Sequence, residues 1–172
     1  LQRQRIALAA ESIENNVRSK IIKEHLNDPA FYEKMSKLLD EVIKQRKQKA
    51  IDYEEYLQKI ADLVKRVEAG HEDSTPDALK KSPGMRAIYN NIQSVEPTTI
   101  NLGVAESGES CDDVHLGLAT QIHKTVLEVR PDGWRGNQAK ENEIQRALLP
   151  LLNNNVNEVM RIFEIIKAQK EY

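Results

Sequence analysis

Helical periodicity of the apolar residues is the feature that most constrains this chain. Apolar side chains recur every three or four positions, which places them along one side of an α-helix. The first such series consists of Ile6, Ala10, Ile13, Val17 and Ile21. Comparable series occupy most of the remaining chain, and none of its segments is convincing as a β-strand. The sequence therefore predicts an all-α fold, a bundle of about six to seven amphipathic helices with one long loop.

Capping residues give several of the expected helix boundaries. Asp28 precedes Pro29, a pair that is typical of an N-cap followed by the first helical position. Asp52 and Glu55 have the spacing of a capping box. Gly70 stands where a helix over residues 53–69 would end, because glycine readily adopts the left-handed conformation of a C-cap.

The helices are expected to form three parts. Residues 1–70 form a three-helix N-terminal part, residues 71–111 a connector with a short helix and a mobile loop, and residues 112–172 the C-terminal helices. The loop falls on residues 95–110, a polar stretch without helical periodicity. Together these parts are expected to make one compact domain. The chain starts in what reads as the middle of a helix, which indicates a piece cut from a longer protein.

Composition narrows the classes of protein to which the chain can belong. The 172 residues carry a net charge of −2, whereas a dedicated nucleic-acid binder is usually strongly basic. Aromatic residues make up only 5%, so the core must be built from aliphatic side chains. A single cysteine, Cys111, fits a reducing compartment. No apolar run reaches the length of about 20 residues that spans a bilayer.

Residues that could carry chemistry do not form a convincing catalytic set. Cys111, Asp113 and His115 lie close in the sequence, but a zinc site needs three or four ligands at suitable spacing. A capped helix start with a surface histidine is the favoured interpretation. No phosphate-binding glycine loop is found, and no nucleophile is paired with a base. We expect no catalytic residue, metal site or cofactor in this chain.

The only tryptophan lies in an unusual segment, "VRPDGWRGNQ", at residues 129–138. Pro131 and Gly133 predict a turn between two helices, and Asn137 predicts the cap of the second helix. Trp134 is interpreted first as a structural plug over this corner, because its ring buries a large apolar area wherever it packs. A binding hot spot remains the alternative.

Two groups of basic residues could contact a DNA backbone. The first lies in "KQRKQK" at residues 44–49 and consists of Lys44, Arg46, Lys47 and Lys49. The second, Arg130 and Arg135, flanks Trp134. For the first group a solvated helix end that opposes the helix dipole is favoured. Phosphate binding would instead be salt-sensitive and independent of base sequence.

Two stretches resemble one protein family when they are taken together. Residues 27–67 contain "NDPAFY", then the basic run and "YEEYL", and residues 129–152 contain "PDGWRGN" followed by an amphipathic helix. This order is similar to the C-terminal helical region of the R subunits of type I restriction enzymes. The resemblance covers most of the chain, and residues 95–110 are its least secure part.

The resemblance implies a cytoplasmic, prokaryotic protein without catalytic residues in this piece. The R subunits of the family join a nuclease domain and an ATP-dependent DNA translocase to helical domains. ATP and Mg²⁺ would then bind parts of the parent protein that this chain lacks. The helical domains are thought to dock the R subunit onto the methyltransferase core, which is made of modification and specificity subunits. Contact with DNA would come through the parent complex.

The resemblance leads to an expected role in assembly. Apolar residues that flank the main helical stripes, such as Leu39, Ile43 and Leu149, indicate an exposed apolar patch for a partner helix. The residues expected to contribute to this patch are Tyr89, Trp134, Leu149 and Phe163. Direct binding of the DNA backbone is the second hypothesis. An unrelated regulatory domain comes third, and an enzyme acting alone comes last.

Overall fold

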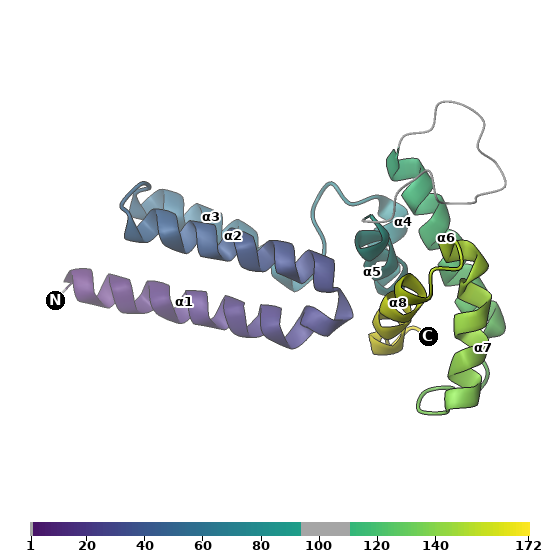
Figure 1. The fold of residues 1–172 in the computed structure, drawn as a ribbon. Helices are drawn as coiled ribbons and strands as arrows, with labels where there is room; N and C mark the ends of the chain where they lie inside the picture. Colours follow the sequence, from purple (N-terminus) through teal and green to yellow (C-terminus); the bar gives the residue numbers. More distant parts are fainter. Residues whose placement is uncertain (1, 94–110) are drawn as a thin grey trace. The chain divides into compact units, whose positions relative to one another are not determined.

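The computed structural model of the chain is built from α-helices (Figure 1). It describes residues 2–93 and 111–172, with side chains for 4–93 and 114–172, and in these ranges it contains eight α-helices and no strand. The all-α prediction is confirmed. The number of helices exceeds the expected six to seven because a single turn, α4 (Asp77–Lys80), forms a separate element. The predicted loop at residues 95–110 lies outside the described residues.

The chain divides into two compact units, Leu1–Thr75 and Pro76–Tyr172. The sequence predicted a single compact domain with a connector over residues 71–111. In the structure, the helix α5 (Pro83–Ile92) of that segment belongs to the second unit and packs against α6 and α8. Eight of its ten residues are buried, since the helix meets neighbours on nearly every side. The helix α5 is therefore part of the core of unit 2, and it does not serve only as a connector.

Unit 1 consists of three long helices that pack against one another (Figure 1). These are α1 (Gln2–Glu24), α2 (Pro29–Lys47) and α3 (Tyr53–Ala69), with the short 3₁₀ helix η1 (His25–Asn27) between the first two. Asp28 caps α2 by accepting a hydrogen bond from the backbone N–H of Phe31. Asp52 caps α3 in the same way, and Gly70 ends α3 with a φ of 72°. The predicted boundaries at these residues are confirmed.

The core of unit 1 is formed by apolar side chains from one side of each helix. Most of them come from the series that the periodicity predicted. The buried members are Ala10, Val17, Ile21, Phe31, Tyr32, Met35, Leu39, Tyr56, Ile60, Leu63 and Val67.

A buried polar network crosses this core and links all three helices of unit 1. The Glu14 carboxylate on α1 accepts two hydrogen bonds from the Arg46 guanidinium on α2, at 2.8 and 3.1 Å. The Tyr56 hydroxyl on α3 donates to the same carboxylate at 3.2 Å. Burial, followed by the nearby Glu14 charge, raises the pKa of Tyr56 to about 12. The hydrogen bond from Arg46 to Glu14 raises the pKa of the guanidinium, which therefore stays charged.

Unit 2 consists of α4, α5, α6 (Cys111–Val129), α7 (Gln138–Leu148) and α8 (Val156–Ala168), with the 3₁₀ helix η3 (Pro150–Leu152) after α7. Side chains of Ser82, Asn137 and Asn155 cap α5, α7 and α8. The cap predicted at Asn137 is confirmed.

The core of unit 2 draws on every helix of the unit. Its fully buried aliphatic side chains include Leu79, Ile88, Ile92, Leu118, Ile122, Val126, Ile144, Leu148, Ile162 and Ile166. Four aromatic side chains, Tyr89, Trp134, Phe163 and Tyr172, complete it.

We expect Glu14→Gln to loosen unit 1. The substitution keeps the size of the side chain but leaves the Arg46 guanidinium, which is largely buried, without its charged partner. Loss of a buried hydrogen-bond partner reduces the free energy of unfolding by roughly 1–3 kcal/mol. Amide hydrogen exchange in α1, α2 and α3 should accelerate accordingly, and Glu68→Gln, at an exposed position of α3, should have little effect. Equal protection in both variants would contradict a stabilising role for the network.

Candidate functional site

The residues expected to form an exposed apolar patch are mostly in the core. Tyr89 is 8% exposed, Trp134 3% and Phe163 1%, so the prediction of a surface patch from these three residues is wrong. Leu149 is half-buried and packs against the same core. The flanking residue Leu39 is also fully buried, in unit 1, and Ile43 is half-buried. Sequence periodicity placed Leu39, Ile43 and Leu149 beside the main helical stripes, but neighbouring helices cover them partly or fully.

Trp134 closes the corner between α6 and α7. Its ring packs against Phe163 of α8 with centroids 5.7 Å apart. The Arg135 guanidinium lies over the indole at 4.4 Å from the ring centroid, in the geometry of a cation–π contact. Its Nε also donates to the carbonyl of Lys167 at 3.2 Å. The corner is therefore packed as the structural interpretation predicted.

A buried carboxylate, that of Glu141, also stabilises the corner between α6 and α7. Glu141 of α7 accepts hydrogen bonds from the backbone N–H of Gly136 at 2.7 Å and from Lys167 of α8 at 2.9 Å. The hydrogen bond from Lys167, followed by that from Gly136, lowers the pKa of Glu141. Gly136 can expose its N–H to this carboxylate because it adopts a φ of 78°, which favours glycine.

The basic residues beside Trp134 hold the C-terminal segment. Arg130 donates to the carbonyl of Glu171 at 3.1 Å, and Arg135 donates to the carbonyl of Gln169. Arg130 Nη1 and Arg135 Nε and Nη2 thus donate hydrogen bonds within unit 2. The structure does not present them as a pair of open phosphate ligands.

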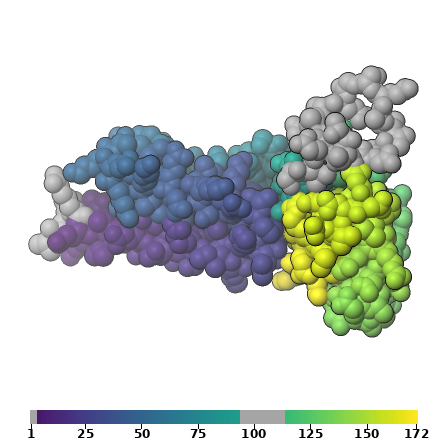
Figure 2. Space-filling view, in the orientation of Figure 1, coloured from purple at the N-terminus to yellow at the C-terminus, as the bar shows by residue number. Residues whose placement is uncertain are grey.

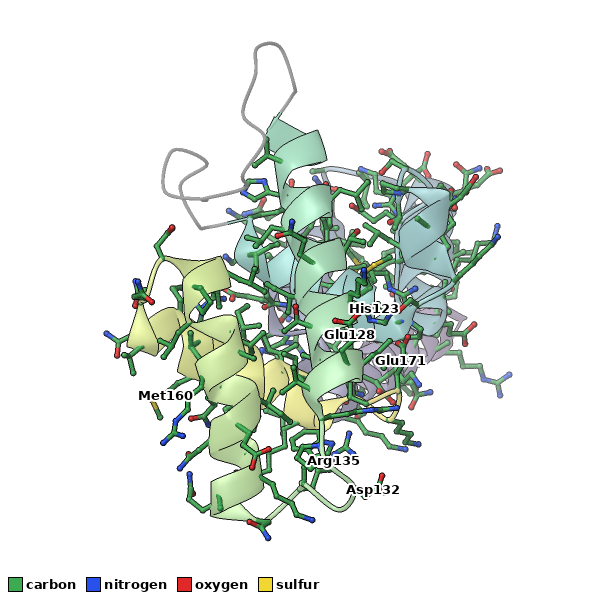
Figure 3. The ribbon with its side chains drawn as sticks, turned by 90° about the vertical axis from the view of Figure 1, so that its right-hand side faces the viewer. His123, Glu128, Asp132, Arg135, Met160 and Glu171 are labelled. Carbon is green, nitrogen blue, oxygen red and sulfur yellow. The ribbon has the colours of Figure 1, made fainter. Side chains whose placement is uncertain are left out.

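A cluster of polar side chains fixes the same segment against α5 and α6. The Glu171 carboxylate accepts from the Ser82 hydroxyl at 2.7 Å and from the Gly84 N–H at 2.8 Å. His123 Nδ1 lies 2.6 Å from the Tyr172 hydroxyl, and its Nε2 lies 3.9 Å from Glu171 (Figure 3). Burial raises the pKa of Tyr172. Sequence reasoning missed this cluster because its members are far apart in the chain.

The cluster contains a serine, a histidine and a carboxylate, but they are not arranged as a catalytic triad. Their hydrogen bonds hold the C-terminal segment against α5 and α6. The Ser82 hydroxyl donates to Glu171 and also accepts from Met85 as the cap of α5. His123 is oriented toward Tyr172 instead of toward the serine. A β-carbon on Gly84 would come within 2.8 Å of both Glu171 and Tyr172, so the tight approach requires glycine.

The four basic residues at the end of α2 have different environments in the structure. Arg46 is held by Glu14 in the core network and lies over the Tyr56 ring at 5.6 Å. It is therefore not available as a backbone ligand, which corrects its place in the predicted DNA-contacting set. Lys44, Lys47 and Lys49 are exposed, and no ion pair engages them within the described part of the chain.

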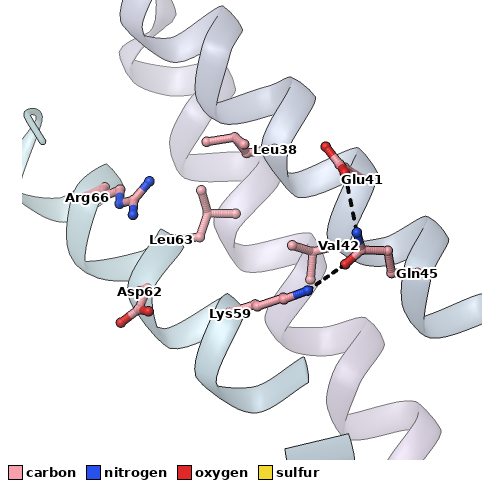
Figure 4. A pocket seen from close by; sticks show the side chains of 8 residues that line it. All are labelled: Leu38, Glu41, Val42, Gln45, Lys59, Asp62, Leu63 and Arg66. Carbon is pink, nitrogen blue, oxygen red and sulfur yellow. Dashed lines mark hydrogen bonds between the residues drawn. The ribbon is translucent and has the colours of Figure 1, made fainter. Parts of the chain in front are cut away.

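A groove lies between α2 and α3 in unit 1 (Figure 4). Its volume is about 250 Å³, and its floor is apolar, formed by Leu38, Val42 and Leu63. A second hollow of about 500 Å³ shares Glu41 and Gln45 with it and extends along α2 to Lys44 and Gln48. The rim of the groove carries both signs of charge and consists of Glu41, Gln45, Lys59, Asp62 and Arg66.

Hydrogen bonds order one end of this rim. Gln45 donates to Glu41 at 3.3 Å and accepts from Lys59 at 2.9 Å, so the chain of contacts runs from α2 to α3 (Figure 4). The lining positions follow i, i+3, i+4, i+7 on both helices, with residues 38, 41, 42 and 45 facing residues 59, 62, 63 and 66. This pattern was visible in the sequence, but nothing there indicated that the two faces would meet beside an uncovered floor.

The described side chains include no group of three or more His, Cys, Asp or Glu residues arranged to hold a metal ion. His115 is buried, contrary to the surface position expected for it, and the side chains of Cys111 and Asp113 lie outside the described residues. None of the described helices combines the length and apolarity that a bilayer crossing requires.

Comparisons with known proteins give no match for this chain, whether with protein-family models, curated proteins or solved structures. Function must therefore be argued from the surfaces described above. Among them, the groove between α2 and α3 combines an apolar floor with a charged rim.

We expect Arg135→Ala to weaken the Trp134 corner. It removes the cation–π contact and the hydrogen bonds to two backbone carbonyls, which together should lower the free energy of unfolding of unit 2 by about 1–2 kcal/mol. Trp134 is the only tryptophan, so its fluorescence during urea unfolding reports on this corner. The matched control is Arg146→Ala, at an exposed position of α7. An unchanged midpoint for Arg135→Ala would show that the corner does not need this arginine.

Proposed function

We propose that this chain is a helical assembly module that receives an amphipathic helix of a partner protein in the groove between α2 and α3. The observation that carries the proposal is the apolar floor of the groove, which lies open between two charged rims. An amphipathic helix can cover such a floor with side chains at i, i+3, i+4 and i+7. The mixed charges of the rim would then select the register and direction of the bound helix.

The identity of the partner in this proposal comes from the resemblance of residues 27–67 and 129–152 to the R subunits of type I restriction enzymes. In that setting the chain is a C-terminal part of the R subunit of a type I restriction enzyme. It attaches the ATP-dependent translocase and endonuclease to the methyltransferase core of modification and specificity subunits. The chemistry, with ATP and Mg²⁺, belongs to the rest of the parent protein, and this chain contributes binding only.

Charge reversal on the rim tests the assembly proposal without disturbing the core. Glu41 and Asp62 are exposed and lie on opposite sides of the groove. The double variant Glu41→Lys, Asp62→Lys should weaken binding to the methyltransferase complex by at least about tenfold, measured by calorimetry or co-elution. The control is Glu68→Lys with Glu143→Lys, which changes the net charge equally at exposed positions outside the groove. Equal affinity of the two variants would show that the groove is not part of the interface. Absence of any binding by the unaltered chain would show that the methyltransferase complex is not the partner.

A second candidate function is direct contact with the DNA backbone. It is favoured by the three exposed lysines at the end of α2, for which no ion pair is found in the described part of the chain. Each phosphate contact contributes about 0.9 to the slope of log affinity against log salt. Replacing Lys44, Lys47 and Lys49 with Gln should therefore flatten that slope by up to about 2.7.

This second prediction can be measured by fluorescence anisotropy with a short duplex at several salt concentrations. The control replaces three exposed lysines elsewhere, Lys23, Lys65 and Lys170, with Gln. If both triple variants give the slope of the unaltered chain, the lysines at the end of α2 do not bind phosphates.

A further inference from the structure

The outward side of α1 carries an uncharged stripe that continues into η1. Its members follow one another at intervals of four, three, four, three and four residues, and all of them are exposed. They are Leu8, Ser12, Asn15, Ser19, Ile22 and Leu26. The three large apolar members are 64%, 69% and 75% exposed, in chain order. We call these six residues the α1 seam.

The α1 seam has the spacing of a coiled-coil interface. Alternating steps of three and four residues keep a line of side chains facing one neighbouring helix. The opposite side of α1, with Ala10, Val17 and Ile21, is already buried in unit 1. Figure 2 shows that one long side of α1, in purple, lies at the molecular surface over much of its length. The helix therefore has one face packed inside unit 1 and a second heptad face without a neighbour in the described part of the chain.

We propose that the α1 seam binds the α1 seam of a second copy of this chain, with the two helices antiparallel. The seam reads nearly the same from both ends, with apolar residues outermost and hydrogen-bonding residues in the middle. In antiparallel pairing the facing residues are Leu8 with Leu26, Ser12 with Ile22, and Asn15 with Ser19. The contact would be about 27 Å long at the ordinary helical rise.

The charges beside the seam favour this direction over the parallel one. In a parallel pair, Arg18 would lie beside Lys23 of the second copy, and the two positive charges would repel. In the antiparallel pair, Glu11 lies beside His25 of the second copy, once on each side of the two-fold axis. Arg18 then approaches Arg18 of the second copy once, whereas the parallel pair would contain two contacts between Arg18 and Lys23. The Asp40 carboxylate, 2.6 Å from the Arg18 guanidinium, reduces the charge of Arg18 in either arrangement.

The polar centre of the seam can be buried without leaving its groups unpaired. The Ser12 hydroxyl already donates to the carbonyl of Leu8 at 2.9 Å. Asn15 and Ser19 can hydrogen-bond to each other across the two copies. A polar residue at such a position fixes the register of the helices and reduces affinity. We therefore expect a weak but specific dimer.

Self-association goes beyond the proposed function and uses a different surface. The groove for the partner helix is lined by α2 and α3 only, whereas the seam lies on α1 and η1. Variants of the seam should therefore leave binding of the methyltransferase complex unchanged, and variants of the groove should leave dimerisation unchanged. Failure of one proposal can thus be told apart from failure of the other.

Sedimentation of the full chain tests dimerisation directly. The unaltered chain should show a concentration-dependent dimer at up to about 1 mM. The double variant Ile22→Glu, Leu26→Glu should raise the dissociation constant by at least about tenfold, since each copy would then bury two unpaired carboxylates against Ser12 and Leu8 of the other copy. The control is Val156→Glu with Met160→Glu, which has the same spacing and charge on similarly exposed residues of α8. A monomer throughout, or equal effects of the two variants, would overturn the proposal.

Disulfide trapping tests the direction of the helices. In a Cys111→Ser background, Asn15→Cys and Ser19→Cys chains of different size are mixed under mild oxidation. Antiparallel pairing predicts crosslinks chiefly between the two different chains, because residue 15 of one copy faces residue 19 of the other. Crosslinks chiefly within each kind of chain would indicate a parallel pair and overturn the proposed arrangement. Protection of α1 amides from exchange should confirm that both cysteine chains are folded.

Discussion

The hydrogen-bonded network of Glu14, Arg46 and Tyr56 is the interaction on which the surfaces of unit 1 depend. It brings a charged pair from α1 and α2 and a hydroxyl from α3 to one point within the core. A buried charge without its partner is strongly unfavourable, so the three helices are held in one register. That register decides which side of α1 faces outward and which faces of α2 and α3 line the groove. Arg46 thus helps to position the groove that we propose as a binding surface, through its hydrogen bonds to Glu14.

Unit 2 uses polar contacts for a different purpose, which is to fix its last residues. Arg130 and Arg135 hold the backbone of the C-terminal segment, while Ser82 and Gly84 hold the Glu171 side chain. Trp134 is therefore part of the interior of unit 2, and the arginines near it bind the backbone of the C-terminal segment. The groove, the exposed lysines at the end of α2 and the α1 seam all belong to unit 1, and we place the three proposed interactions there.

Sequence reasoning succeeded where a local rule was sufficient. Asp28, Asp52 and Asn137 cap helices as predicted, because a capping side chain bonds to the N–H groups of its own first turn. It failed where distant segments had to be placed. Tyr89 and Phe163 were expected on the surface, yet α5 is enclosed by other helices of unit 2 and Phe163 packs against Trp134. The hydrogen bonds around Glu171 could not be predicted, since Ser82 is 89 residues away in the chain.

The sequence by itself determined that the chain is helical, where several of the helices begin and end, and which residues tend to be apolar on each helix. These properties depend on residues within a few positions of one another. Only the tertiary structure decided which apolar faces are covered, that Arg46 is bound to Glu14, and that α2 and α3 leave a groove between them. Those outcomes depend on which helices meet, and helical periodicity is the same whether or not a neighbour covers the face.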